Sequence, residues 1–261
     1  MNREWTLTEA EWLSCADPQK MLASLLDRGR ASPRKMRLYL CAGCRHISGL
    51  FFQPESLAAV EVAERFADGQ AGQEELDRAE WEAEAPTFGY DFEEWFWRGD
   101  PPGKREVVPR LVEMGALPES ALHGGEWAVN EPVKRRLLAA AELAEACASR
   151  SPRDWDWGRH LSGVGWPGSR LLDCVFGSPF RPLPRLDPSL LTWSDSLAVR
   201  LAQAAYEHRT LPEGHLDFQR LAVLADALEE AGAGPDILGH LRGPGPHVRG
   251  CHVLDLVLGK E

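Results

Sequence analysis

A long apolar run, a secretory leader and a recognisable catalytic signature are all missing from this sequence. Its apolar stretches are broken by charged residues well before they reach the length that a membrane span requires. The opening MNREWTLTEAEWL has no apolar segment after its basic residue, so we expect no signal peptide. The sequence has neither a Walker phosphate loop nor a dinucleotide fingerprint. These absences argue against a membrane protein, a secreted protein and the common nucleotide-binding enzymes.

The sequence has the composition of an ordinary globular protein. The chain has 261 residues, of which 44% are hydrophobic and 26% charged, and this length is enough to bury a sizeable core. Six cysteines without a signal peptide are typical of reduced thiols and not of a disulfide framework. We therefore expect a cytoplasmic protein that has no membrane partner.

Negative charge is concentrated in one segment of the chain. The net charge is −11, and residues 61–100 alone hold 13 acidic and 3 basic residues, a balance of −10. Such a segment repels phosphate backbones, which disfavours nucleic acid as a partner. The first interpretation of the segment is a solvated helical face, and the second is a docking surface for a basic protein partner.

Apolar residues recur at helical spacing in residues 1–85 and 166–261, and this pattern predicts an all-α fold. Proline and glycine mark the beginnings and ends of the expected helices. The region between them, residues 86–165, is rich in Trp, Gly and Pro. We expect an orthogonal multi-helix bundle that forms a single domain over residues 1–261, with residues 86–165 as an insert. The insert's aromatic residues either complete the core or line a small-ligand site.

Two C-terminal segments are harder to interpret. Residues 180–193 predict an extended, proline-rich link, with Ser194 or Asp195 capping the helix that follows. Residues 253–258, VLDLVL, fit both a strand and a helix; the helix is favoured, with Gly259 as its end. No segment has a convincing strand-turn-strand pattern, so we expect a mostly α-helical fold.

LADALEEAG at residues 224–232, followed by HLRGPGPHVRGCHVLDLVLGKE at residues 240–261, resembles an uncharacterised helical family abundant in planctomycete-type bacteria. Residues 8–69 and 171–193 are similar to its N-terminal and central blocks, whereas the Trp-rich middle does not match. The stretch around LADALEEAG is also similar to the repeat-companion motif of those bacteria, which usually has Trp where Ala227 stands. The resemblance implies an all-helical fold and a bacterial cytosolic setting, and it implies no activity.

Two clusters of Cys and His supply the sharpest candidate site. Cys41 and Cys44 form a CxxC pair within a predicted helix, and His247 and Cys251 lie in the C-terminal Gly-Pro segment. Because structural zinc sites commonly use four Cys and His ligands, these residues predict a zinc site that pins the tail onto the third helix. The competing interpretation is that the thiols are simply part of the core. Three further histidines could replace one of the ligands: His46, His240 and His252.

Other arrangements suit other chemistry. Cys251 with His247 as its base would make a thiol nucleophile. Asp226 shares a predicted helix face with Glu229 and Glu230, which suits acid–base work but is more typical of a polar face with an ion pair to Arg220 or Arg242.

The C-terminal stretch RGPGPHVRG also has two interpretations. Its residues Arg242 and Arg249, with exposed backbone N–H groups, could bind an anion. A rigid turn whose two prolines fix the path of the chain is the favoured interpretation.

The functional expectation follows from the missing catalytic set. We expect a non-catalytic protein-interaction or scaffold module that binds a protein partner. The first alternative is a zinc-binding protein or enzyme built on Cys41, Cys44, His247 and Cys251. The second is a small-ligand protein that uses the Trp-rich insert.

Overall fold

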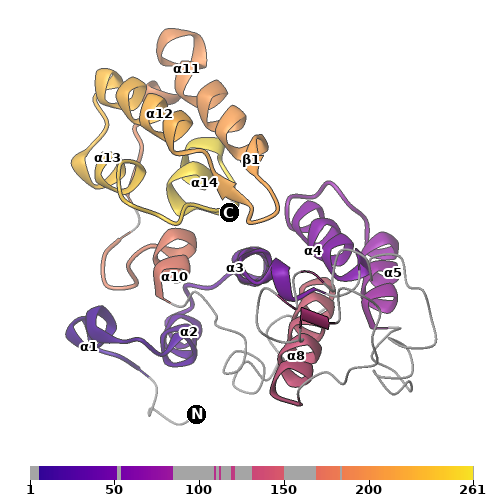
Figure 1. Ribbon diagram of the computed structural model, residues 1–261. Helices are drawn as coiled ribbons and strands as arrows, with labels where there is room; N and C mark the ends of the chain where they lie inside the picture. Colours follow the sequence, from indigo (N-terminus) through magenta and orange to yellow (C-terminus); the bar gives the residue numbers. More distant parts are fainter. Residues whose placement is uncertain are drawn as a thin grey trace. The chain divides into compact units, whose positions relative to one another are not determined.

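The computed structural model describes residues 6–51, 54–84, 131–149, 169–182 and 184–260, with isolated positions between 109 and 120. Helices make up most of this part of the chain (Figure 1), and the predicted all-α fold is confirmed. Most of the insert predicted over residues 86–165, including its ligand-site alternative, lies outside the described residues.

The helices follow one another along the chain with few strands between them. Their bounds are α1 (Glu9–Ser14), α2 (Pro18–Asp27), α3 (Pro33–His46), the 3-10 helix η2 (Ser48–Leu50), α4 (Pro54–Ala67), α5 (Gln73–Glu84), α8 (Glu131–Ala148), α10 (Ser169–Phe176), α11 (Pro188–Glu207), α12 (Phe218–Ala231), α13 (Pro235–Leu241) and α14 (His252–Leu258).

The chain divides into two compact units, and one is inserted in the sequence of the other. The first unit comprises Met1–Ala42 and Pro167–Glu261, and the second comprises Gly43–Trp166. The inserted unit spans residues 43–166 and includes α4 and α5, whereas the sequence predicted an insert over residues 86–165 only. The cause is that α4 and α5 pack against α8, a long-range contact that helical periodicity does not reveal.

Local signals set the ends of helices in the first unit. Thr8 and Glu11 form a capping box at α1, in which the Thr8 hydroxyl accepts from the Glu11 amide at 3.3 Å and the Glu11 carboxylate accepts from the Thr8 amide at 2.8 Å. Asp217 caps α12 by accepting from the Arg220 amide at 2.8 Å. Gly232 ends that helix with φ +96°, a left-handed conformation that favours glycine.

Helix α14 is the packing centre of the first unit. It contacts α10, α11 and α13, while α12 packs on α11 and α13, and α2 packs on α10. Val253, Leu254 and Val257 of α14 are buried. The helix predicted for residues 253–258 is therefore confirmed, and Gly259 ends it with φ +64°.

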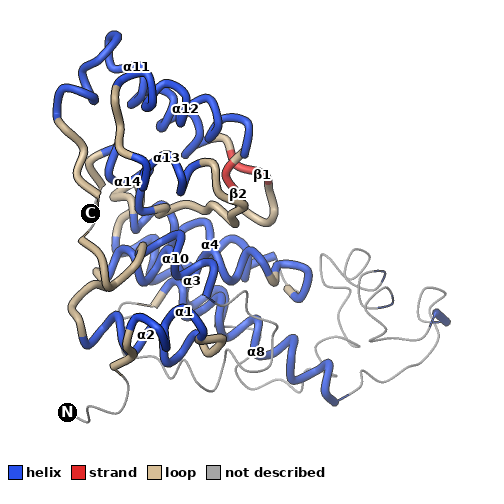
Figure 2. The backbone as a smooth tube through the Cα atoms, turned by 90° about the vertical axis from the view of Figure 1, so that its left-hand side faces the viewer, coloured by secondary structure: helices blue, strands red, loops and turns tan. Residues whose placement is uncertain are grey.

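A small hairpin in the first unit accompanies the helices. Strands β1 (Arg209–Thr210) and β2 (His215–Leu216) pair antiparallel (Figure 2). Each strand has two residues, too few for the alternation of apolar and polar residues that identifies a strand in a sequence. This hairpin reaches the candidate site because His215 also forms an isolated bridge with Val248.

The prediction of an extended link over residues 180–193 is wrong from Pro188 onward. Helix α11 begins at Pro188, with Asp187 as its cap accepting from the Ser189 amide at 2.9 Å. The Asp-Pro pair suits a cap and a first helical position as well as it suits a link. The backbone is non-helical from Trp193 to Ser196, where the sequence predicted the helix to begin.

The second unit contains a bundle of three helices. Helices α4, α5 and α8 pack pairwise, and η2 contacts α8. Buried alanines in all three helices keep the helix contacts close: Ala59, Ala63, Ala79, Ala83, Ala140 and Ala144. An ion pair is buried with them, since Arg45 donates to Glu64 from Nε at 2.7 Å and from a terminal nitrogen at 2.8 Å. This two-point contact satisfies both charges where water does not reach.

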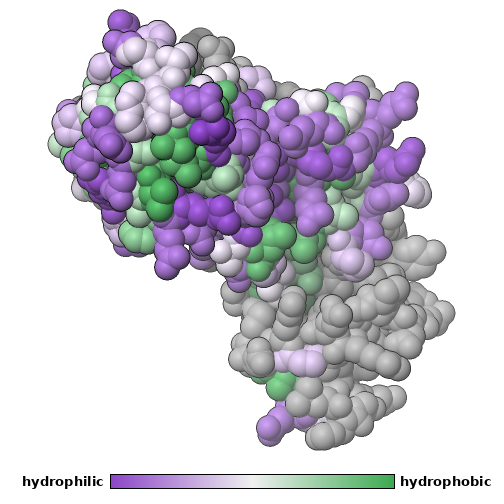
Figure 3. All heavy atoms as spheres, turned by 90° about the horizontal axis from the view of Figure 1, so that it is seen from above, coloured by the Kyte–Doolittle hydropathy of each residue, from purple (hydrophilic) through white to green (hydrophobic). Residues whose placement is uncertain are grey.

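Hydrophilic residues cover most of the described surface on the face drawn in Figure 3, with small apolar areas among them. Among the residues that the structure describes, no helix combines the length and the apolar character needed to cross a membrane.

Candidate metal centre

Four side chains with metal-binding atoms converge in the first unit. They are Cys174, His240, His247 and Cys251, and one ligand atom from each lies within 4.8 Å of the others. Both cysteines and His247 are buried, and His240 is half-buried. Burial separates this group from the exposed acidic clusters that occur on many protein surfaces.

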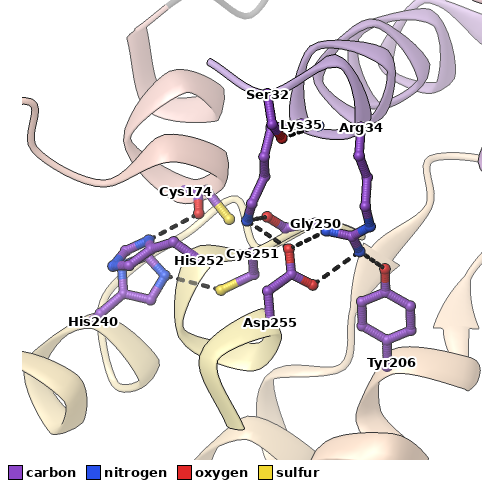
Figure 4. Close-up of polar contacts among 10 residues, drawn as sticks. All are labelled: Ser32, Arg34, Lys35, Cys174, Tyr206, His240, Gly250, Cys251, His252 and Asp255. Carbon is purple, nitrogen blue, oxygen red and sulfur yellow. Dashed lines mark hydrogen bonds and ion pairs between the residues drawn. The ribbon is translucent and has the colours of Figure 1, made fainter. Parts of the chain in front are cut away.

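Each residue of the group reaches the site from a different element. Cys174 lies in the last turn of α10, His240 in the last turn of α13, His247 in the loop after α13, and Cys251 at the N-cap of α14. Figure 4 shows the side chains of Cys174, His240 and Cys251 directed toward one another from these elements. The site therefore depends on the packing of α10 and α13 against α14.

The Gly-Pro loop is held in place by backbone hydrogen bonds. His247 accepts through its carbonyl oxygen from the Leu216 amide of β2 at 2.8 Å, and Val248 accepts from the Cys251 amide at 3.0 Å. The Gly245–Pro246 peptide bond in this loop is cis. The loop thus carries His247 and Cys251 as a fixed pair on the β1–β2 hairpin.

His247 presents one ring nitrogen without a partner. Its Nε2 lies 3.3 Å from the carbonyl oxygen of Gly243, to which it can donate. Its Nδ1 is buried and has no hydrogen-bond partner among the described residues, although His247 is only 6% exposed. A buried polar atom without a partner is unfavourable unless something satisfies it. The arrangement is typical of a metal-binding histidine, which donates one ring N–H to a carbonyl and offers the other nitrogen to the ion.

The cysteines and histidines of the site influence one another's protonation. Burial alone would raise the pKa of Cys251, but hydrogen bonds with Cys174 and His240 and the nearby His247 bring that pKa well below its ordinary value. The hydrogen bond to Cys251, together with burial, holds the pKa of Cys174 well above its usual range. Burial would lower the pKa of His247, and the adjacent Cys251 outweighs this and raises it. The site thus favours one thiolate next to one thiol.

His252 supports the site without belonging to the group of four. Its Nδ1 lies 3.0 Å from the carbonyl oxygen of Cys174, to which it donates (Figure 4). Its ring packs edge-to-face on that of His240 at 4.2 Å between centroids. These contacts fix the backbone of one candidate ligand and the ring of another. His252 was one of the three histidines that the sequence offered as an alternative ligand.

A buried charge cluster ties the ligand-bearing segment to α3 (Figure 4). Asp255, which is 2% exposed, accepts from Arg34 at 2.7 and 3.1 Å and pairs with Lys35. Arg34 also donates to the Tyr206 hydroxyl at 2.9 Å, and Lys35 donates to the Gly250 carbonyl at 2.7 Å. Because Gly250 precedes Cys251, this cluster fixes the backbone at that ligand.

Replacing Gly250 by alanine is expected to destabilise the first unit by about 1–3 kcal/mol. Two effects combine, the backbone strain of alanine in a left-handed conformation and the crowding of its Cβ atom against Leu38. Gly250 has φ +87°, and a Cβ atom there would lie 2.8 Å from Leu38 Cδ1 and 3.0 Å from Leu38 Cβ. Gly232→Ala is the matched control, because Gly232 has φ +96° and no atom within 4 Å of the added Cβ. Urea unfolding measures both variants. Equal losses would show that Leu38 adjusts at no cost.

The predicted zinc set and the observed group share His247 and Cys251. His240, which the sequence offered as an alternative ligand, and Cys174 complete the group in place of Cys41 and Cys44. Cys41 is a fully buried core residue of α3 in the first unit. Cys44 belongs to the second unit, where its Sγ lies 3.4 Å from that of Cys147 and both residues are fully buried.

The two arginines of the Gly-Pro segment make other contacts. Arg242 donates to Asp226 at 2.7 Å and to Glu229 at 2.6 Å, and these carboxylates raise the pKa of its guanidinium. The ion pair expected on this helix face is therefore present. The Arg249 guanidinium lies 5.2 Å from the centre of the Tyr206 ring. Both contacts fit a rigid turn better than an anion site.

Two cavities adjoin the candidate metal centre. One of about 220 Å³ is lined by Cys174, His240 and His247, together with Arg170 and the Gly243–Pro246 turn. The other, of about 360 Å³, is lined by His240 and His252 and by residues of α1, including Trp12. Small molecules can therefore approach three of the four candidate ligands from the first cavity.

The described residues define an all-α protein with a buried Cys₂His₂ group. No protein-family model matches the chain, and neither a curated protein nor a solved structure matches it.

Proposed function

We propose that this chain is a zinc-binding protein in which Cys174, His240, His247 and Cys251 hold one Zn²⁺. The observation that carries the proposal is the convergence of these four residues on a buried point, and His247 Nδ1 has no hydrogen-bond partner among the described residues. Zinc suits this donor set, because two thiolates and two imidazoles are a common combination in its structural sites.

The spacing of the ligand atoms suits the binding of a single ion. Zinc bonds of about 2.0–2.3 Å place neighbouring ligand atoms of a tetrahedron roughly 3.3–3.8 Å apart. The four atoms lie within 4.8 Å of one another, so contraction by about 1 Å at the longest separation closes the tetrahedron. Side-chain rotation can supply such a movement. Each ligand belongs to a different segment of the chain, so each side chain can rotate independently of the others.

A structural role for the metal follows from the number of ligands. Four protein ligands fill a tetrahedral site, whereas catalytic zinc sites keep one position for water or substrate. The ligands come from α10, α13, the Gly-Pro loop and the N-cap of α14. One ion would therefore fasten together the helices around the packing centre of the first unit.

On this basis the protein is a non-catalytic module of a bacterial cytosol, and its partner is another protein. The resemblance of residues 224–232 and 240–261 to a family of planctomycete-type bacteria supports the setting, and six free cysteines support a reducing compartment. The acidic segment at residues 61–100 disfavours nucleic acid as the partner.

Metal analysis of the purified chain tests the proposal. We expect one zinc per chain, and Co²⁺ in its place should give the intense visible absorption of a tetrahedral thiolate site. Cys174→Ser should lower the affinity for zinc by about 10-fold or more, because a serine hydroxyl stays protonated and binds zinc poorly. Isothermal titration with zinc measures the affinity of each variant.

Cys15→Ser is the matched control, because it makes the same replacement of a thiol by a hydroxyl at a half-buried residue that lies outside the group of four. This control should bind zinc like the original chain. A folded chain that takes up no zinc, or a Co²⁺ form without thiolate absorption, would overturn the proposal even if Cys174→Ser failed to fold.

A further inference from the structure

The two cysteines of the metal centre differ in their access to small molecules. Cys174 lines the cavity of about 220 Å³ beside the site, as do His240 and His247. Cys251 is fully buried and does not belong to the cavity lining. Of the two cysteines, Cys174 is therefore the one that a small oxidant entering this cavity can contact.

The second cysteine lies within reach of the first. The Sγ atoms of Cys174 and Cys251 are no more than 4.8 Å apart, and a disulfide needs them at about 2.05 Å. Cys174 is in the last turn of a helix and Cys251 is an N-cap residue outside the regular part of its own helix. Both cysteines therefore lie at helix ends, where rotation of the two side chains can bring the sulfurs together.

We propose that Cys174 and Cys251 form a peroxide-responsive pair, whose oxidation to a disulfide releases the zinc ion; this inference rests on the zinc site proposed above. Hydrogen peroxide or an alkyl hydroperoxide is the oxidant. Cys174, which zinc binding keeps as a thiolate, attacks one peroxide oxygen, the O–O bond breaks, and a hydroxide or alkoxide leaves and takes a proton from solvent.

The second step closes the disulfide. The product of the first step is a sulfenic acid on Cys174, and the Cys251 thiolate attacks its sulfur. The S–O bond breaks, the S–S bond forms, and hydroxide leaves and is protonated to water. The two sulfurs supply the two electrons that reduce one peroxide. A dithiol reductant reverses the reaction by thiol–disulfide exchange.

Zinc release follows from the ligand count. A disulfide sulfur has no thiolate charge to offer, so the ion keeps only His240 and His247 as protein ligands. Two imidazoles without the thiolates bind zinc far more weakly than the full set. The oxidation state of the pair thereby controls whether the centre of the first unit is held by a metal or by a disulfide.

The experiment treats the zinc-loaded chain with stepwise additions of hydrogen peroxide. A chromogenic chelator measures released zinc, a thiol reagent counts the remaining thiols, and peptide mapping locates disulfides. We expect one zinc to be released and two thiols to be lost for each peroxide consumed, with Cys174 joined to Cys251. Dithiothreitol followed by zinc should restore the starting state.

Two variants sharpen the test. Cys174→His keeps a zinc-binding side chain at this position but cannot form the disulfide, so its zinc should be released about 10-fold or more slowly. Cys147→Ala removes a close thiol pair outside the site, Cys44 and Cys147, and should release zinc like the original protein. If Cys174→His does not fold, the peptide map of the original chain still decides.

The outcomes separate this inference from the zinc site itself. A chain that binds no zinc overturns both proposals. A chain that binds zinc but keeps it under peroxide, or releases it with Cys174 and Cys251 recovered as thiols or as separate sulfinic acids, overturns only the redox proposal.

Discussion

Removal of zinc by a chelator is expected to lower the free energy of unfolding of the first unit by about 4 kcal/mol, when the comparison is made at free zinc about 1,000-fold above its dissociation constant. The physical reason is that the folded unit brings the four ligands together, whereas the unfolded chain does not hold Cys174 near the other three. For a chain of this size, such a loss corresponds to a fall of about 8–16 °C in the unfolding midpoint.

Amide hydrogen exchange with and without zinc locates this effect. Protection should fall in α10, α13 and α14, which carry ligands, and should stay unchanged in α4 and α5 of the second unit. Cys174→Ser provides the control, because zinc should raise its midpoint by less than it raises that of the original chain. An equal loss of protection in both units would show that the metal acts elsewhere.

Replacing Asp255 by alanine is expected to cost about 3–5 kcal/mol of stability, the usual loss when one member of a buried ion pair is removed. Arg34 and Lys35, whose side chains are 14% exposed, would lose the carboxylate that both of them contact. Lys35 would keep the Gly250 carbonyl and Arg34 the Tyr206 hydroxyl, neither of which carries a charge. Denaturant unfolding measures the loss.

Asp226→Ala is the matched comparison for this prediction. Asp226 also pairs with an arginine at 2.7 Å, but its side chain is 73% exposed and that of Arg242 is 40% exposed. Pairs so accessible to water contribute at most about 1 kcal/mol. Zinc stoichiometry should be normal in both variants, since neither residue is a ligand. A loss below about 1 kcal/mol for Asp255→Ala would contradict the role given to this cluster.

Local signals in the sequence predicted much of the fold, because they mark where helices begin and end. Thr8 with Glu11, and Gly232 after LADALEEA, mark a helix beginning and a helix end because both act over a few residues of chain. The β1–β2 hairpin was missed because each of its strands has two residues. The ion pair between Arg34 of α3 and Asp255 of α14 was not predicted either, because these two residues are far apart in sequence and meet only through tertiary packing.

The candidate site was half predicted for the same reason. His247 and Cys251 are four residues apart, a ligand spacing that can be recognised in a sequence. Cys174 lies in the short apolar helix LLDCVF, where a cysteine resembles any other core residue, and no spacing connects it to the loop. The CxxC pattern of Cys41 and Cys44 predicted metal ligands, but both residues are fully buried in the core.

The discontinuous sequence of the first unit has a consequence for synthesis on the ribosome. Residues 43–166 are complete before residues 167–261 have been made, so the second unit can fold while the first still lacks most of its helices. Arg34 must wait for Asp255, a delay of about 10–40 s at ordinary rates of translation. Until α10 has been made, the apolar face of α2, with Met21, Leu22 and Leu25, lacks this partner and is available to chaperones.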